Sequence, residues 1–187
     1  MMRVAVSGLT GCGATTATKL VARRLRLKRI NYTFRDLAKD RGIPFAKMQF
    51  DKIEREFPKW DLLLDGKQVA GVAKTPRCIV GSRLAVWLDG AVAKKLGKRV
   101  KINSKFWLGV PLRVRAGRVA RREGKPFAQA LRETRLRDKN NAARYKKLYG
   151  IDVRKRPRGT IVIDAERLDA KGVTDAIVSE IKCRHRN

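Results

Sequence analysis

The distribution of apolar and polar residues predicts buried strands that alternate with helices along the whole chain. Short apolar runs rich in β-branched or aromatic residues indicate central strands, and they lie at residues 3–7, 30–32, 78–80, 106–110 and 160–163. Helical spacing of apolar residues, with breaks at Gly and Pro, predicts helices at residues 15–27, 34–40, 45–57, 112–121, 126–149 and 173–181. Pro58 is expected to end the third of these helices.

This alternation predicts an α/β fold with three layers. βαβ crossovers place helices on both faces of a central parallel sheet. A chain of 187 residues is long enough to bury one core, so we expect a single domain over residues 1–187. The helical region at about residues 112–150 is expected to form a lid, and residues 182–187 a short basic tail.

A glycine-rich turn joins the first strand to the first helix, and its sequence is typical of a phosphate-binding loop. The fixed positions of the frame G-x-x-x-x-G-K-[ST] are matched by Gly8, Gly13 and Thr15. Gly11 lies within the frame, and Thr16 follows it. In such loops, backbone N–H groups at a helix N-terminus surround phosphates and a hydroxyl binds magnesium. Ala14 occupies the lysine position, so a charge that stabilises the transferring phosphoryl group is missing. Anion binding without catalysis and a purely structural turn both remain open.

The chain also has a large excess of basic residues, which suggests a second kind of ligand. The chain has 46 Lys and Arg against 17 Asp and Glu, a net charge of +29. Residues 91–160 hold 23 of these basic residues and only four acids. An ion-rich hyperthermophile surface would also be enriched in Glu, which is not the case here. A polyanion such as nucleic acid would relieve the self-repulsion.

The cysteines and the apolar runs exclude several other classes. Cys12, Cys78 and Cys183 form no C-x-x-C pair and no zinc-ligand spacing, which indicates a reducing compartment. No apolar run has the length of a signal-peptide core or a membrane span. We therefore expect a cytoplasmic protein without a membrane partner.

Several segments resemble the archaeal cytidylate kinases, which are P-loop nucleoside monophosphate kinases, from residue 2 to about residue 181. Residues 34–42 are similar to the family's F-R-E-L-A-K-x-x-G segment, and residues 82–87 to its G-R-L-A-G-W run. Residues 111–118 are similar to its P-L-x-V-R-A-x-R run, and residues 144–152 to the end of its lid and the following I-Y-G-I-D. The chain is therefore identified as a divergent, strongly basic member, and the resemblance implies the three-layer P-loop NTPase fold.

Two departures from the family pattern remove carboxylates. Gly81 stands where the family's V-L-E-G-R has its acid, and residues 153–158 are basic where the family is acidic. Both changes make the net charge more positive and remove carboxylates that could bind magnesium.

The resemblance implies one possible function, transfer of the γ-phosphoryl group of ATP to CMP or dCMP. In that case Gly11, Gly13 and Thr15 would hold the donor phosphates and magnesium. Arg35 and Arg83 would bind the acceptor phosphate. The lid arginines that would stabilise the transition state are Arg115, Arg118, Arg135 and Arg137.

We favour a second interpretation, a catalytically retired kinase scaffold that binds RNA as a ribosomal protein or ribosome-associated factor. An enzyme acting on a small nucleotide gains nothing from a net charge of +29, whereas ribosomal RNA would neutralise it. The expected partners are ribosomal RNA and neighbouring ribosomal proteins, with no required cofactor and no metal site. If the chain has kept nucleotide or kinase function, we expect it to bind ATP and magnesium, with Thr15 as the magnesium ligand. A further alternative is a nucleotide-dependent factor in ribosome assembly. The residues expected to contact RNA are Lys98, Arg99, Lys101, Lys105, Arg121, Arg122, Lys125, Arg144, Lys146, Lys147, Arg154, Lys155, Arg156 and Arg158.

Overall fold

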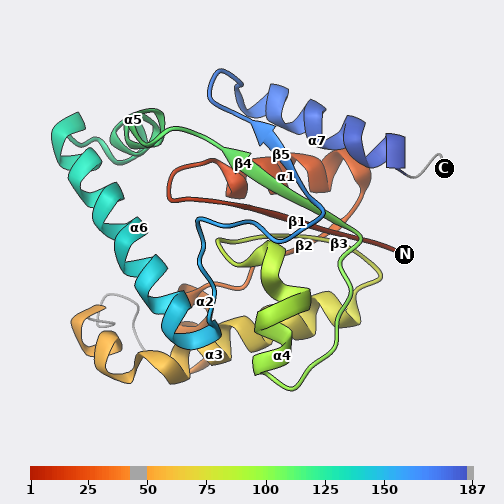
Figure 1. Cartoon of the computed structure of the whole chain (residues 1–187), viewed down its shortest axis with the longest axis horizontal. Coiled ribbons are helices and arrows are strands. Elements are labelled where there is room, and N and C mark those ends of the chain that lie inside the picture. The colour runs from red at the N-terminus through yellow and green to blue at the C-terminus, as the bar shows by residue number, and fades with distance from the viewer. Residues whose placement is uncertain (43–49, 185–187) are drawn as a thin grey trace.

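A parallel sheet forms the centre of the molecule (Figure 1). The computed structural model describes residues 1–42 and 50–184, the latter without the side chains of residues 50–58. Within this part of the chain, five strands pair in the order β2-β3-β1-β4-β5, and every pairing is parallel. The strands are β1 (Met2–Gly8), β2 (Lys28–Ile30), β3 (Arg77–Gly81), β4 (Ser104–Gly109) and β5 (Thr160–Asp164).

Helices cover both faces of this sheet. On one face lie α1 (Ala14–Leu25) and α7 (Ala170–Arg184), which pack on Val4, Val6 and Phe106. The other face carries α3 (Phe50–Lys74) and a winding segment made of η2 (Ala85–Trp87), η3 (Leu88–Val92) and α4 (Ala93–Lys95). The remaining helices are α2 (Phe34–Asp40), α5 (Leu112–Glu123) and α6 (Phe127–Tyr149).

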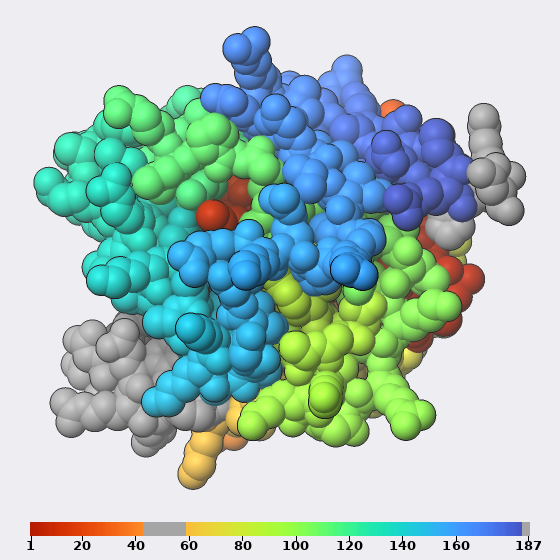
Figure 2. All heavy atoms as spheres, in the orientation of Figure 1, coloured from red at the N-terminus to blue at the C-terminus, as the bar shows by residue number. Residues whose placement is uncertain are grey.

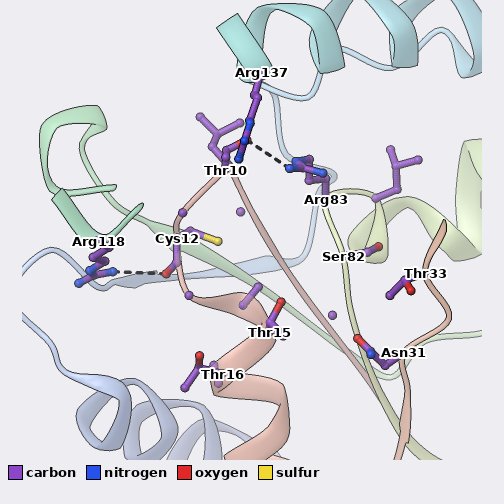
Figure 3. A pocket seen from close by; sticks show the side chains of 18 of the residues that line it. Thr10, Cys12, Thr15, Thr16, Asn31, Thr33, Ser82, Arg83, Arg118 and Arg137 are labelled. Carbon is purple, nitrogen blue, oxygen red and sulfur yellow. Dashed lines mark hydrogen bonds between the residues drawn. The ribbon is translucent and has the colours of Figure 1, made fainter. Parts of the chain in front are cut away.

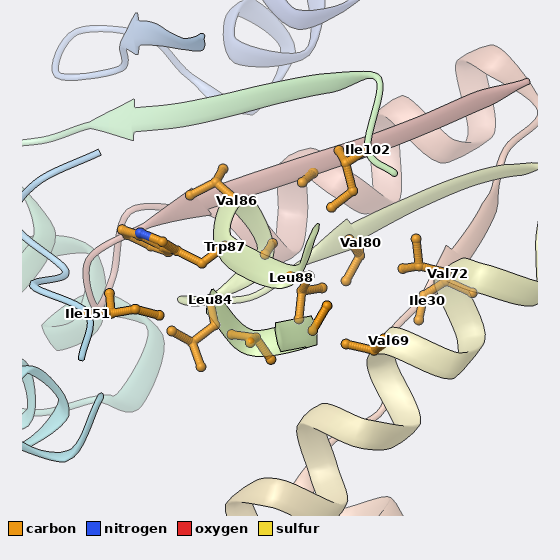
Figure 4. Packing of buried hydrophobic residues seen from close by; sticks show 14 of the residues in the cluster. Ile30, Val69, Val72, Val80, Leu84, Val86, Trp87, Leu88, Ile102 and Ile151 are labelled. Carbon is orange, nitrogen blue, oxygen red and sulfur yellow. The ribbon is translucent and has the colours of Figure 1, made fainter. Parts of the chain in front are cut away.

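The period of two along each strand produces these two cores. In β1, Val4 and Val6 face α1 and α7, while Ala5 between them faces the α3 side. On the α3 side, Val69 and Val72 pack with the buried winding segment against Val80 of β3 (Figure 4). Trp87 meets Trp107 of β4 edge to face, with ring centroids 5.8 Å apart. The predicted α/β fold with a central parallel sheet is confirmed.

The α5–α6 pair lies beyond the carboxyl end of β4 and occupies the region predicted as a lid (Figure 1). Pro111 and Pro126 precede the two helices, and Gly124 and Gly150 end them in the left-handed conformation. In the space-filling view, a hollow beside this pair exposes atoms of the red N-terminal segment (Figure 2).

One helix differs from its prediction. The expected end at Pro58 is wrong, because α3 continues through this residue to Lys74. The buried residues Trp60, Val69 and Val72 lie on the continuation, and their burial outweighs the roughly 3 kcal/mol that an interior proline costs. The first residues of the predicted helix, 45–49, lie outside the described part of the chain.

Candidate active site

The glycine-rich turn adopts a conformation that its glycines alone permit. Gly13 caps the N-terminus of α1 with φ 95°, and Gly11 has φ 82°. A Cβ on Gly11 would lie 2.8 Å from the backbone oxygen of Arg115, and one on Gly8 would lie 2.5 Å from the Cys12 sulfur. No side chain of the described residues caps α1, so its first backbone N–H groups are available to an anion.

A cavity of about 580 Å³ extends from this turn to α3. Its wall is formed by residues 8–17, the β2–α2 connection, the end of β3 and parts of α3, α5, α6 and α7. Figure 3 shows the side chains that surround the turn. The arginines that line the cavity are Arg83, Arg118, Arg122, Arg137 and Arg144.

Three of these arginines approach the turn from different elements (Figure 3). Arg83, just after β3, lies 3.4 Å from the Thr10 hydroxyl through Nη2. Arg118 of α5 donates to the backbone oxygen of Ala165 at 2.7 Å and lies 3.4 Å from that of Cys12. Arg137 of α6 is about half exposed and is held loosely by Glu123 and Glu133 at 3.7 and 3.8 Å. The cavity therefore concentrates positive charge around a loop that can bind phosphates.

Arg115 serves a different purpose from its neighbours. It is buried and donates to the backbone oxygens of Val110 and Thr10 at 3.0 and 2.8 Å. It also pairs with Asp138 of α6 at 2.7 Å, and the second oxygen of Asp138 accepts the backbone N–H of Thr10 at 3.1 Å. This buried ion pair ties both α5 and α6 to the glycine-rich turn.

The α3 wall carries buried acceptor groups. Asp61, Asp65 and Gln68 are 2, 5 and 5% exposed and line the cavity with Leu64. Burial raises the pKa of Asp61 to about 6 and that of Asp65 to about 7. Tyr149 of α6 donates its hydroxyl to Asp65 at 2.5 Å, and burial raises the pKa of this tyrosine.

Gly81, at the position of the family's acid, has no space for a side chain. A Cβ there would lie 2.6 Å from Cγ2 and 2.8 Å from Oγ1 of Thr18. Thr18 is buried in α1 and donates its hydroxyl to the backbone oxygen of Thr15 at 3.1 Å. In place of the acid, the Thr18 side chain of α1 fills the space beside the end of β3.

The structure brings most of the phosphate-site residues predicted from the sequence to this cavity. Those that line it are Gly8, Gly11, Gly13, Thr15, Thr16, Arg83, Arg118 and Arg137. Arg35 and Arg135 are exposed on α2 and α6 and are absent from the lining, and Arg115 is buried behind the turn. Within the described residues, no group of three His, Cys, Asp or Glu side chains could hold a metal ion.

The residues predicted to contact RNA are scattered over several elements. Arg122 and Arg144 line the cavity, Lys105 pairs with Asp89 at 2.7 Å, and Lys125 pairs with Glu123 and Glu133 at 3.1 and 2.8 Å. Arg154 is exposed and pairs with Asp152 at 2.9 Å. The others are exposed on the surface: Lys98, Arg99, Lys101, Arg121, Lys146, Lys147, Lys155, Arg156 and Arg158.

Asp61, Asp65 and Gln68 were not predicted as site residues. Their spacing of four and three residues places them on one helical face, but the expected end of the helix at Pro58 concealed that face. The available signal was the recurrence of these three polar residues at helical spacing in the segment that also carries the apolar residues Trp60, Val69 and Val72.

The strand order and the glycine-rich turn define the fold of the P-loop NTPases. Among solved structures, deoxyadenosine kinase from M. mycoides with bound dATP shares the fold with a TM-score of 0.60 at 16% identity, covering 97% of this chain and 100% of that one. Shikimate kinase from Aquifex aeolicus gives a TM-score of 0.55 at 14% identity, covering 100% and 99%. The predicted P-loop fold is confirmed by these neighbours.

The sequence comparisons identify the family. The model of the cytidylate kinase-like family matches residues 3–167, and the chain belongs to this family. It is 34% identical to cytidylate kinase 2 of Borrelia garinii over 98% of both chains. It is 32% identical to the cytidylate kinase of Archaeoglobus fulgidus over 98% of this chain and 96% of that one.

These findings overturn the prediction of a ribosomal, RNA-binding protein. Relatives named cytidylate kinase align with nearly the whole chain. The excess of basic residues is therefore not evidence that the chain is a ribosomal protein. The inclination toward a protein that is not an enzyme is likewise unsupported. The predicted partners, ribosomal RNA and ribosomal proteins, followed from that function and remain an untested prediction. Among the described residues, no helix is both long and apolar enough to cross a membrane.

Proposed function

We propose that this protein is a nucleoside monophosphate kinase that transfers the γ-phosphoryl group of ATP to CMP or dCMP. The observation that carries this proposal is a continuous cavity that joins the glycine-rich turn to α3 and that five described arginines line. A monophosphate kinase needs such a space, because donor and acceptor phosphates must meet in line away from bulk water.

The donor phosphates bind to the turn. Backbone N–H groups at the start of α1 point toward them, and the dipole of α1 adds to the attraction. Gly8 and Gly11 allow the turn to pack tightly, since a Cβ at either position would collide with Cys12 or Arg115.

In phosphate-binding loops that have the lysine, its charge stabilises the transferred phosphoryl group. In this protein the cavity arginines supply that charge. Arg83, Arg118 and Arg137 reach the turn from three separate elements. During transfer, the bond from the γ-phosphorus to the bridging oxygen of ADP breaks and a bond to an oxygen of the CMP phosphate forms, giving ADP and CDP. Guanidinium groups around the transferred group stabilise the charge on its equatorial oxygens.

Magnesium fits this site through the nucleotide rather than through a carboxylate cage. The Thr15 and Thr16 hydroxyls line the cavity at the start of α1, and magnesium ordinarily keeps several waters and binds substrate phosphates. These hydroxyls would hold the ion, which would neutralise charge on the donor phosphates when bound.

A pair of α6 variants tests this proposal. Arg137→Gln removes a cavity arginine, and Arg132→Gln changes an exposed arginine on the same helix outside the cavity. We expect the first change to lower kcat/KM for CMP at saturating ATP by about 100-fold or more, since a lost transition-state donor costs roughly this much. The second should leave kcat/KM within about 2-fold, as expected for an exposed charge. No CMP phosphorylation by the folded wild-type protein would contradict the proposal, and equal effects of the two changes would contradict the role given to Arg137.

A further inference from the structure

A second cavity lies at the outer edge of the sheet, beside the edge strand β2. It has a volume of about 550 Å³ and is lined by β2, α2, the connection between these elements and the C-terminal part of α3. We call it the outer cavity. Asn31 and Tyr32 line both the outer cavity and the cavity at the glycine-rich turn, so the β2–α2 connection lies between the two spaces.

Basic side chains from three elements line the outer cavity. They are Lys28 and Arg29 of β2, Lys39 of α2, and Lys67 and Lys74 of α3. All four lysines are exposed, and Lys28, Lys39 and Lys74 form no ion pair with a carboxylate of the described residues. None of the five lines the cavity at the glycine-rich turn, so the proposed kinase reaction gives them no role.

Two carboxylates also line the outer cavity, and both have partners within the protein. Asp36 belongs to the capping box of α2 and accepts the backbone N–H of Thr33 at 2.8 Å. Asp40 accepts the Tyr32 hydroxyl and lies 3.5 Å from Lys67 Nζ. The Lys67–Asp40 pair is about half exposed, and pairs of this kind contribute little. The described lining therefore keeps an excess of three positive charges, five cations against two carboxylates.

The size and the charge of the outer cavity define the ligand that it fits. Its volume lies within the range of about 300 to 1,000 Å³ that small-molecule sites occupy. A single phosphate group carries roughly −1.5 to −2 charges at pH 7, which is less than the excess on the lining. Two or more linked phosphates supply the missing charge, and their oxygens can accept hydrogen bonds from several lysines at once.

We propose that the outer cavity is a second anion site, separate from the cavity at the glycine-rich turn, and that it binds a chain of two or more linked phosphates. Lys28, Lys39 and Lys74 would bind the phosphate oxygens from three different elements. Inorganic polyphosphate and a nucleoside triphosphate both contain such a chain. The inference goes beyond the proposed function and does not depend on it, because the two cavities use different cations.

Diffuse attraction is the competing explanation, since a net charge of +29 attracts any polyanion. Two triple variants of equal net charge separate a site from this background. The outer-cavity variant removes three cations of the lining and combines Lys28→Gln, Lys39→Gln and Lys74→Gln. The control variant removes three exposed cations outside both cavities and combines Lys98→Gln, Lys101→Gln and Lys182→Gln.

Calorimetric titration with inorganic tripolyphosphate, at about 0.1 M ionic strength and without magnesium, tests the proposal. We expect two molecules to bind to each wild-type chain, one at the glycine-rich turn and one in the outer cavity. In the outer-cavity variant, one of these two sites should weaken by about 10-fold or more, because charge-assisted hydrogen bonds to phosphate are lost. Both sites should stay within about 2-fold of wild type in the control variant.

Acetylation of the wild-type protein, followed by mass spectrometry, locates the same site without any substitution. Tripolyphosphate should slow the acetylation of Lys28, Lys39 and Lys74 severalfold and leave that of Lys98 unchanged.

A titration with CTP separates the two sources of the phosphate chain, and either order of affinity supports the site. Tighter binding of CTP than of tripolyphosphate at the outer cavity, by about 10-fold or more, would identify a nucleotide as the ligand. Equal or weaker binding of CTP would identify the phosphate chain alone.

Three results would overturn the proposal. One is equal weakening in the two triple variants, which would show that the charge acts diffusely. Another is a wild-type protein that binds tripolyphosphate only at the glycine-rich turn. The third is acetylation of Lys28, Lys39 and Lys74 that tripolyphosphate slows no more than it slows that of Lys98.

Discussion

Asp138 neutralises a guanidinium that the fold buries next to the phosphate-binding turn. The Asp138 and Arg115 side chains are 17 and 5% exposed, so Arg115 has little water to replace a lost partner. Asp138→Asn keeps an acceptor for the Thr10 N–H but removes the charge. We expect the free energy of unfolding, measured in urea, to fall by about 3 kcal/mol.

The exposed ion pair between Asp175 and Arg24 provides the control for this change. Asp175→Asn should alter the free energy of unfolding by about 0.5 kcal/mol or less. Similar losses from both substitutions would mean that the Arg115–Asp138 pair adds nothing beyond an ordinary surface contact.

Asp65 makes stability depend on pH in an unusual direction. Its pKa is about 7 in the folded protein, while an unfolded aspartate titrates near 4. Between these values the folded state holds the extra proton, so the free energy of unfolding falls as pH rises through this window. Asp65→Asn removes this contribution, and the difference between wild type and variant should change by about 3 kcal/mol from pH 4 to pH 7. Parallel pH profiles of unfolding would contradict the assigned pKa.

At the scale of elements, the contact between α1 and β3 explains why the family's acid cannot simply be restored. Gly81→Glu alone should destabilise the protein, because its Cβ would collide with the Thr18 side chain. Adding Thr18→Ala removes both colliding atoms, and we expect it to recover about half or more of the lost free energy of unfolding. Thermal unfolding of the two single variants and the double variant measures this coupling. Additive losses would show that Thr18 does not fill the position of the acid.

The elements also show what could be predicted from the sequence. The strand before Gly8, the glycine frame and the helix after it follow from local rules, since each depends on neighbouring residues. The continuation of α3 beyond Pro58 depends instead on burial against the sheet, which lies far away in sequence. Arg115 could not be told from Arg118 or Arg137, because its partner Asp138 is 23 residues away on another helix.

For the molecule as a whole, the charge of +29 proved a poor guide to function. Net charge bears on association and solubility, not on the reaction that a site performs. In the proposed function, the five described arginines that line the cavity would give part of this excess a local use in binding anionic nucleotides. The exposed arginines and lysines between residues 98 and 158 would add a long-range attraction for the same ligands.

This attraction should appear as a dependence of catalysis on salt. Raising ionic strength from about 0.02 to about 0.3 M shortens the Debye length several-fold, so kcat/KM for CMP should fall severalfold, mainly through KM. Changing Arg154, Lys155, Arg156 and Arg158 to Ser removes four exposed charges outside the cavity and should flatten this dependence while leaving kcat in place. A kcat/KM that is independent of salt in both proteins would exclude electrostatic steering.

The central claim is that this strongly basic chain is a working kinase despite Ala14 and Gly81. The most direct test is chromatographic measurement of products from ATP, CMP and magnesium with the purified wild-type protein. We predict equal amounts of CDP and ADP, formed at about 1 to 100 per second, and about 100-fold less product in Arg137→Gln. Absence of CDP from a folded protein that binds both nucleotides would contradict the claim, and equal CDP formation in wild type and Arg137→Gln would contradict only the role given to Arg137.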